Sequence, residues 1–357
     1  MKNKIVELIA ANVEGLTAAE IADLIEIPPK PELGDFAFPC FRLAKTMRKA
    51  PQMIANDIKE AIGNVDFLQE IQVQGAYLNF FVKKELFIET MVTSSMADDF
   101  GSSTEGNGQT ICIDYSSPNV AKNFHVGHLR TTIIGNSLYK IYSKLGYKVV
   151  RINHLGDWGT QFGKLIVAYK AWGSAEAVKK DGVAELMKLY VKFHEEAEKN
   201  PELNDEARAW FAKMEHGDEE ALKIWQWFKD ISLIEYKRTY DLLGMDFDYY
   251  LGESFYRDKT DDVVKRLTDA NLLTESEGAK IVDLDAYDMA PCLILKNDGS
   301  SIYATRDIAA IFYRKETYNF VKCLYVTGQE QKLHFKQVFK VVELLGNEWA
   351  KDQLVHI

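Results

Sequence analysis

The feature that most constrains the fold is a strand–loop–helix–strand unit in the first half of the 357-residue chain. The apolar run Ile111–Tyr115 predicts a strand, and a polar loop follows it before a helix begins. A second predicted strand, Lys148–His154, leads into the glycine-rich turn GDWGTQFG at residues 156–163. Parallel strands joined by a helix carry ligand groups at their carboxyl ends. We therefore expect a binding site in the loops that follow these two strands.

The loop after the first strand ends in the tetrapeptide HVGH, which supplies groups suited to phosphate. His125 and His128 lie at the predicted helix start, where free N–H groups and the positive end of the helix dipole favour an anion. Gly127 lets a polyphosphate approach the backbone closely, and Lys122 offers a fixed positive charge. Such histidines can also be capping or solvated groups, and Lys122 can be a solvated loop residue. The polar loop and the neighbouring glycine-rich turn favour an ATP site.

Further blocks of polar residues follow along the chain and carry a family resemblance. In chain order the blocks are SSPNVAKNFHVGH, GDWGTQFG, GES (Gly252–Ser254), YATRDIAA (Tyr303–Ala310) and TGQEQKLHF (Thr327–Phe335). HVGH resembles the first signature of the class I aminoacyl-tRNA synthetases. The other blocks and their order are more specific, and they resemble the arginyl-tRNA synthetase family over nearly the whole chain.

The resemblance implies a reaction and a set of site residues. L-Arginine would be activated with ATP to arginyl-adenylate and then transferred to the terminal ribose of tRNA(Arg). The implied catalytic residues are His125, His128 and Lys122, and the implied ATP contacts are His125, Gly127, His128, Gly328 and His334. The implied arginine contacts are Asp114, Ser117, Asn119, His154, Asp157, Gln161, Glu253, Tyr303, Asp307 and Gln331. Mg²⁺ would arrive with ATP, and no ligand spacing in the sequence predicts a tightly bound metal.

Selecting arginine requires a complement to a planar, permanently charged guanidinium group. Carboxylates and an aromatic hydroxyl provide it. Tyr303 and Asp307 are four residues apart, so they share one face if their segment is helical. Other interpretations remain open at this stage. Asp307 could pair with Arg306 on a solvated face, Asp157 could be a helix N-cap, and Asp114 could be a turn carboxylate at a strand end.

The pattern of helices and strands predicts an α/β protein with two domains. Residues 1–100 predict a small α+β domain, in which residues 28–40 read as a loop and Phe41–Lys49 as a helix. The resemblance implies that this is a tRNA-contacting domain; Phe36, Phe38 and Phe41 could stack on bases, although such aromatics are more often core. Polar residues 98–109 predict a linker. Residues 109–357 predict a Rossmann-like parallel-sheet catalytic domain with a helical insertion at about 173–244, and the predicted strands include Ala279–Asp285, Cys292–Lys296 and Val321–Thr327.

Composition limits the compartment and the partners. No apolar run approaches the roughly 20 residues that cross a bilayer, and the amphipathic N-terminus is not typical of a signal peptide. The four cysteines are widely spaced, which favours reduced, buried thiols in the cytoplasm. The net charge of −10 argues mildly against nucleic acid, so the tRNA prediction rests on the resemblance. We expect a cytoplasmic protein, without membrane contact, that is a monomer.

The last residues, QLVHI, predict the beginning of a strand. In the family such a strand leads to a KMSK-type loop and then to an anticodon-binding domain. We therefore expect the chain to be the front part of a longer enzyme and, by itself, to be inactive in full aminoacylation. Two other functions are open: a small-molecule nucleotidyltransferase of the HxGH type, and a non-catalytic RNA- or ligand-binding fragment. The long helical insertion and the extra N-terminal domain argue against the nucleotidyltransferase.

Overall fold

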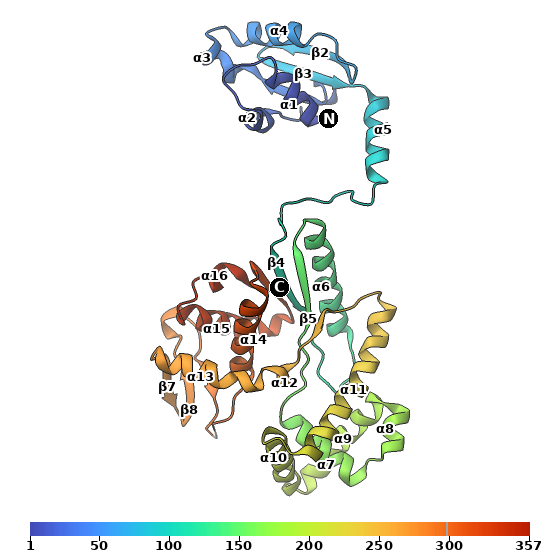
Figure 1. Cartoon of the computed structure of the whole chain (residues 1–357), viewed down its shortest axis with the longest axis vertical. Helices are drawn as coiled ribbons and strands as arrows, with labels where there is room; N and C mark the ends of the chain where they lie inside the picture. The colour runs from blue at the N-terminus through green and yellow to red at the C-terminus, as the bar shows by residue number, and fades with distance from the viewer. Residues whose placement is uncertain (298) are drawn as a thin grey trace. The chain divides into compact units, whose positions relative to one another are not determined.

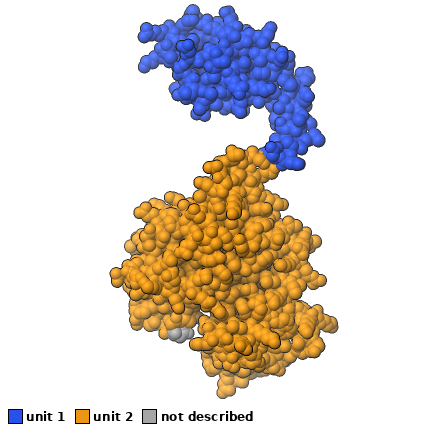
Figure 2. Space-filling view, viewed as in Figure 1, with its two compact units in different colours: residues 1–101 blue, residues 102–357 orange. Residues whose placement is uncertain are grey.

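The computed structural model describes residues 1–297 and 299–357, and the chain divides into two compact units. Unit 1 is Met1–Gly101 and unit 2 is Ser102–Ile357 (Figure 2). Each unit has its own hydrophobic core. In the described part of the chain, no helix is long and apolar enough to cross a membrane.

Unit 1 is a small α+β fold built on an antiparallel sheet of order β1-β3-β2. Its core combines helix residues such as Ile5 and Ile54 with strand residues such as Phe38 and Phe80. The strands are β1 (Phe36–Pro39), β2 (Leu68–Gln74) and β3 (Tyr77–Val82). The α-helices are α1 (Lys2–Ala10), α2 (Ala18–Leu24), α3 (Ala44–Met47), α4 (Pro51–Ile62) and α5 (Lys84–Ser95).

Two local predictions in unit 1 were wrong. The segment predicted as a loop contains β1, a short strand that pairs with β3 and is too brief to show an alternating pattern. The segment predicted as one helix, Phe41–Lys49, is a 3₁₀ turn at Cys40–Leu43 followed by the single turn of α3. Arg48, in the left-handed conformation with φ of 51°, ends that helix.

Unit 2 is organised around a parallel sheet of order β11-β10-β4-β5-β6. Alternate residues of β4 enter different cores: Ile111 and Ile113 pack on one face, and Cys112 packs on the other. Both faces are therefore covered, as is usual for a parallel sheet. Its strands are β4 (Thr110–Tyr115), β5 (Lys148–Asn153), β6 (Tyr249–Tyr250), β10 (Lys322–Val326) and β11 (Leu354–His356).

Helices cover the two faces of this sheet (Figure 1). Helix α6 (Val126–Lys144) connects β4 to β5, while α14 (Tyr303–Tyr318) and α15 (Lys332–Leu344) contribute to the core on the other face. The remaining helices of this region are α12 (Glu253–Tyr256), α13 (Thr260–Asp269) and α16 (Ala350–Gln353). The α/β fold with a Rossmann-like parallel sheet is thus confirmed.

The predicted strands at Ala279–Asp285 and Cys292–Lys296 do not join the parallel sheet. They are β8 (Ala279–Val282) and β9 (Cys292–Leu295), which form a separate antiparallel sheet with β7 (Leu273–Ser276) in the order β7-β8-β9. The tight turn Glu277-Gly278, in which both residues have positive φ, joins β7 to β8. Such a turn builds an antiparallel hairpin, whereas a parallel pair needs a longer crossover.

Helices occupy the segment between β5 and β6, and Figure 1 shows most of them gathered in one cluster. Trp158, Trp210 and Trp225 are among the large side chains buried there. The helices are α7 (Thr160–Trp172), α8 (Ala175–Asp181), α9 (Val183–Lys199), α10 (Glu202–Glu215) and α11 (Glu219–Leu242). The last of these, α11, runs back to the sheet and contacts the loop that follows β4.

Candidate functional site

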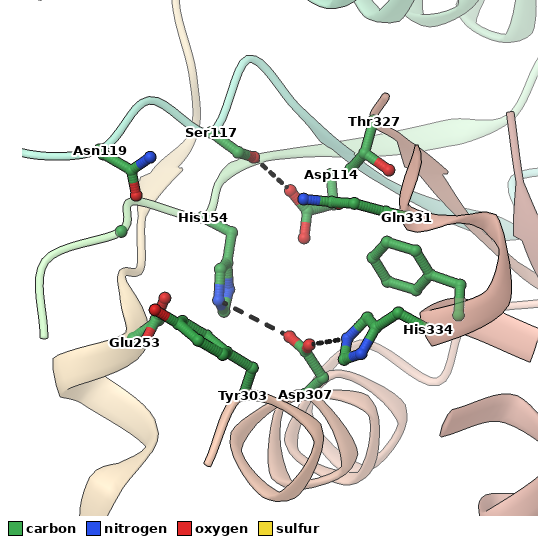
Figure 3. Close-up of a pocket in the computed structure, with 12 residues that line it drawn as sticks. Asp114, Ser117, Asn119, His154, Glu253, Tyr303, Asp307, Thr327, Gln331 and His334 are labelled. Atoms are coloured by element: carbon green, nitrogen blue, oxygen red, sulfur yellow. Dashed lines mark hydrogen bonds and ion pairs between the residues drawn. The ribbon is translucent and has the colours of Figure 1, made fainter. Parts of the chain in front are cut away.

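A cavity of about 360 Å³ opens where β4, β5 and β10 end. Polar side chains from five separate segments converge on it, as the close-up in Figure 3 shows. The lining residues are Asp114, Ser117, Asn119, His154, Gly156, Glu253, Tyr303, Asp307, Thr327, Gln331, His334 and Phe335. This position matches the rule that open α/β sheets bind ligands at the carboxyl ends of their strands.

The loop after β4 is held in an unusual backbone conformation that presents Ser117 and Asn119. Ser116 and Ser117 have φ of 74° and 47°, which turns the chain sharply at the end of the strand. Ser117 Oγ then donates a 2.9 Å hydrogen bond to Oδ1 of Asp114. Gly156 lies against Asn119 so closely that a Cβ atom there would be 2.0 Å from Oδ1 of the amide. Any larger residue would displace the Asn119 amide, so glycine at this position lets Asn119 keep its place.

Helix α11 fixes the same loop from the other side. The hydroxyl of Tyr236 lies 2.6 Å from the carbonyl oxygen of Asn119 and 2.8 Å from that of Lys122. Ser232 Oγ accepts a 3.0 Å hydrogen bond from the backbone N–H of Ala121. These partners satisfy backbone groups of a non-helical loop, which would otherwise be costly to bury. The helical insertion therefore helps to shape the candidate site.

Asp114 is not a simple turn carboxylate. It is 5% exposed, and its Oδ2 lies 2.8 Å from Nη2 of the fully buried Arg314. The same Nη2 lies 3.2 Å from Nδ1 of His154, whose ring stacks on Tyr256. Arg314 thus offsets the charge of Asp114 and links two residues of the pocket wall.

Asp307 and Tyr303 lie one helical turn apart on α14, and both line the cavity, as the four-residue spacing predicts. Asp307 does not pair with Arg306. Its Oδ2 lies 2.6 Å from Nε2 of His334, and its Oδ1 lies 3.9 Å from Nε2 of His154. Burial alone would raise the pKa of Asp307, but the hydrogen bond to His334 and the nearby charges lower it overall. Asp307 is therefore a carboxylate at neutral pH.

Glu253 is the second carboxylate at this end of the pocket, and it begins α12. Its Oε2 lies 3.0 Å from Nε of Arg306, which leaves Oε1 for another partner. Burial, together with the neighbouring Asp307 and Asp157, raises the pKa of Glu253 to about 8 despite the opposing effect of Arg306. Glu253 is thus poised to lose a proton when a cation enters.

The HVGH residues lie at the start of α6, outside the lining of this cavity. His125 is the N-cap, and its Nδ1 accepts the N–H of Gly127 at 3.1 Å; Nδ1 of His128 accepts the N–H of His125 at 3.3 Å. Both rings therefore have Nε2 left as a donor. Burial and the neighbouring His125 and Lys122 lower the pKa of His128 to about 4, so this ring is neutral at pH 7.

Two predicted arginine contacts lie elsewhere. Asp157 is fully buried and is not the N-cap of α7. Its carboxylate accepts hydrogen bonds from Lys229 Nζ at 2.6 Å and from the N–H and Oγ of Ser254 at 2.8 and 2.7 Å. It supports the segment that presents Glu253. Gln161 lines a separate small cavity that also contains Lys122. Gly328 precedes the short 3₁₀ helix at Gln329–Gln331 and is next to the lining residue Thr327.

The sequence interpretation missed both buried arginines, Arg306 and Arg314. Each lies on α14 within or just after the YATRDIAA block. A lone buried charge is very costly, so each buried arginine needs an acidic partner. The sequence did not indicate burial, because Arg306 is next to Asp307 and Arg314 is followed by Lys315 and Glu316.

Comparison with known proteins identifies the family. A family described as "tRNA synthetases class I (R), catalytic domain" matches residues 91–357, and "Arginyl tRNA synthetase N terminal domain" matches residues 3–82. The chain belongs to the arginyl-tRNA synthetase family. This confirms the resemblance drawn from the motifs.

Relatives with the name arginine–tRNA ligase match the whole chain. That of Alkaliphilus metalliredigens is 58% identical over 353 residues, which are 98% of this chain and 62% of the relative. That of Clostridium perfringens is 57% identical over 358 residues, which are 100% of this chain and 63% of the relative. The chain thus spans less than two thirds of the length of these ligases.

Solved arginyl-tRNA synthetases share the fold. The structure from Plasmodium falciparum gives a TM-score of 0.65 at 24% identity and covers 100% of this chain and 64% of the solved chain. The structure from Thermus thermophilus gives a TM-score of 0.65 at 20% identity, and the match covers 100% of this chain and 65% of the solved chain. The chain therefore has the fold of these solved structures.

Proposed function

We propose that the chain provides the arginine- and ATP-binding part of an arginine–tRNA ligase. The observation that carries this proposal is the acidic end of the cavity, where Glu253 and Asp307 lie with the hydroxyl-bearing Tyr303. Two carboxylates and a phenol match the donors of a guanidinium. The enzyme would act in the cytoplasm, as a monomer, on free arginine, ATP and tRNA.

L-Arginine would lie across the cavity with its guanidinium group at the acidic end. Oε1 of Glu253 and the Asp307 carboxylate would accept its N–H groups, because Oε2 of Glu253 is already held by Arg306. The α-amino and carboxylate groups would face Asp114, Ser117 and Asn119 at the end of β4. His154 and Gln331 would line the wall between the two ends.

Adenylation would take place where the cavity faces the start of α6. A carboxylate oxygen of arginine would form a bond to the α-phosphorus of ATP, and the bond from that phosphorus to the pyrophosphate oxygen would break. Mg²⁺ would travel with ATP. The Nε2–H groups of His125 and His128 would stabilise charge on the phosphate oxygens, with Lys122 as a fixed cation. Gly328 and His334 would contact the adenosine part.

The second step would use the tRNA. A hydroxyl of its terminal ribose would attack the activated carbonyl carbon, forming the ester and releasing AMP. Unit 1 would contact the RNA elsewhere. Among its three candidate aromatics, Phe38 is fully buried, whereas Phe41 is 48% exposed beside the exposed Arg42. Phe36 is half-buried, so Phe41 is the most exposed of the three and the best placed to stack on a base, an interaction of about 1–3 kcal/mol.

Isothermal titration of the chain with L-arginine, L-citrulline and L-lysine tests the amino-acid assignment. Citrulline keeps the shape of arginine without the charge, and lysine keeps the charge without the planar fork. Each unpaired buried acceptor costs about 1–3 kcal/mol, so both analogues should bind at least about fivefold more weakly. Equal affinity for the three amino acids would rule out this pocket as an arginine selector.

The ligase reaction itself is tested with tRNA. Arginine-dependent exchange of pyrophosphate into ATP, followed by charging of tRNA(Arg), should be measured in a full-length ligase that carries this chain. Exchange with another amino acid but not with arginine would contradict the proposal.

A further inference from the structure

Arg314 does not line the pocket, but it contacts two residues that do. Its side chain is fully buried, and its Nη2 lies 2.8 Å from Oδ2 of Asp114 and 3.2 Å from Nδ1 of His154. A guanidinium nitrogen can donate a hydrogen bond but cannot accept one. Nδ1 of His154 must therefore be the acceptor in this contact, and it carries no proton.

The position of the remaining proton follows from this contact. A neutral imidazole with an unprotonated Nδ1 carries its hydrogen on Nε2. Nε2 of His154 lies 3.9 Å from Oδ1 of Asp307, and the dashed lines in Figure 3 show both histidines that approach this carboxylate. His154 would thus offer Asp307 a donor without a charge. A charged ring there would repel a guanidinium bound to Asp307.

The groups around His154 come from several elements. Asp114 at the end of β4, Asp307 on α14 and Asp157 in the loop after β5 all raise its pKa. Burial, the largest influence, and Arg314 both lower it, and the net effect is a lowered pKa. The uncharged ring of Tyr256 stacks on it with centroids 5.4 Å apart. Arg314 is the nearby cation that opposes the three carboxylates.

We propose that Arg314 is a positioning residue that holds His154 as the uncharged Nε2–H tautomer, so that the pocket can accept a cationic substrate beside Asp307. The proposal rests on arginine as the substrate for its functional meaning. The tautomer itself does not depend on the substrate. A failure of the chain to bind arginine would therefore remove the proposed function and leave the tautomer open to measurement.

The first test needs no substitution at Arg314. Long-range ¹⁵N–¹H spectra of the ¹⁵N-histidine-labelled chain distinguish the two neutral tautomers and the imidazolium, and His154→Gln assigns the signal by its loss. Between pH 6 and 8 we expect an unprotonated Nδ1 and a protonated Nε2 at His154. A protonated Nδ1, alone or in an imidazolium, would overturn the proposal.

The second test changes the positioning group. Arg314→Lys keeps a cation for Asp114, but the single ammonium group of lysine lacks the planar fork of arginine. We expect His154 in this variant to populate both tautomers and to titrate at a higher pH. If only the neutral ring admits arginine, protonation of His154 should weaken binding. The Kd of the variant for arginine should then exceed the parental Kd by up to about tenfold for each pH unit below the new pKa of His154.

Arg266→Lys is the matched control. Arg266 on α13 is 41% exposed and pairs with the exposed carboxylates of Asp262 and Glu316, so the spectrum of His154 should not change. Circular dichroism checks that each variant is folded. A folded Arg314→Lys chain with the parental His154 tautomer and titration would show that Arg314 does not hold the ring. If that variant does not fold, the spectrum of the parent chain still decides the proposal.

Discussion

Arg306 Nε donates a hydrogen bond to Oε2 of Glu253 inside the candidate arginine pocket, at 3.0 Å and with side chains only 8% and 10% exposed. The pair connects α14 to α12, so both elements meet at the acidic end of the cavity. A buried pair of this kind contributes little to stability by itself, but it defines where the charges lie. Here it leaves one oxygen of Glu253 for a ligand.

The raised pKa of Glu253 predicts that arginine binding depends on pH. Burial raises this pKa to about 8 in the free chain, with Arg306 opposing and Asp307 and Asp157 adding to the effect, so much of Glu253 is protonated at pH 7. A bound guanidinium favours the carboxylate, so binding should release protons and the Kd should fall as pH rises from 6 to 8. Titration calorimetry at pH 7 in buffers of different ionisation enthalpy measures the protons released. Glu253→Gln should abolish that release, and a parent chain that releases none would contradict the prediction.

Asp307→Asn should weaken arginine binding without unfolding the chain. The amide fills the same space and can still accept a hydrogen bond from His334, but it removes one charge-assisted contact. That loss should cost about 1.5–3 kcal/mol of binding free energy, measured by titration calorimetry. Asp262→Asn, at an exposed carboxylate on α13, is the control. Parental arginine affinity in the Asp307 variant would remove this residue from the pocket.

Lys229→Met should destabilise unit 2, because Lys229 pairs with the fully buried Asp157. Removing one partner of a buried pair typically costs about 3 kcal/mol or more. Urea denaturation followed by circular dichroism measures the free energy of unfolding. Lys265→Met, in an exposed pair with Asp269, should change it far less, because exposed ion pairs contribute little. Equal stability of the two variants would show that Asp157 does not depend on Lys229.

The spacing of residues along the sequence was sufficient to predict some of the residues that line the cavity. The spacing of Tyr303 and Asp307 placed both on one face of a helix, and the structure brings both into the cavity. The polar residues after β4 and β5 converge because the ends of parallel strands share one edge of the sheet. These features depend on helical period and on strand direction, which a sequence shows directly.

Long-range pairing could not be predicted in the same way. Asp114 lies at the end of β4 and Asp157 in the loop after β5, yet Asp157 binds Lys229 and Ser254 and does not line the cavity. The partners of Arg306 and Arg314 are set by how α14 packs against distant segments. Likewise, β8 and β9 have apolar patterns like those of the parallel strands, and the tight turn between β7 and β8 is the local feature that indicates an antiparallel sheet instead.

His125→Ala and His128→Ala should slow adenylation more than they weaken arginine binding. Neither histidine lines the arginine cavity, and the backbone N–H groups that bind each Nδ1 leave each Nε2–H as a donor at the start of α6. Because the pKa of His128 is lowered to about 4, its ring should remain a neutral donor from pH 5 to 9. Loss of one preorganised donor typically costs on the order of 100-fold in rate.

Arginine-dependent pyrophosphate exchange in a full-length ligase that carries this chain measures that loss, and calorimetry of the chain measures arginine affinity. His216→Ala is the control, since His216 is exposed at the end of α10 and bonds only to the carbonyl of Ala212 among the described contacts. The His128 effect should not vary between pH 6 and 8, because the ring does not titrate there. Parental exchange rates in both HVGH variants would show that the start of α6 does not act on the phosphates.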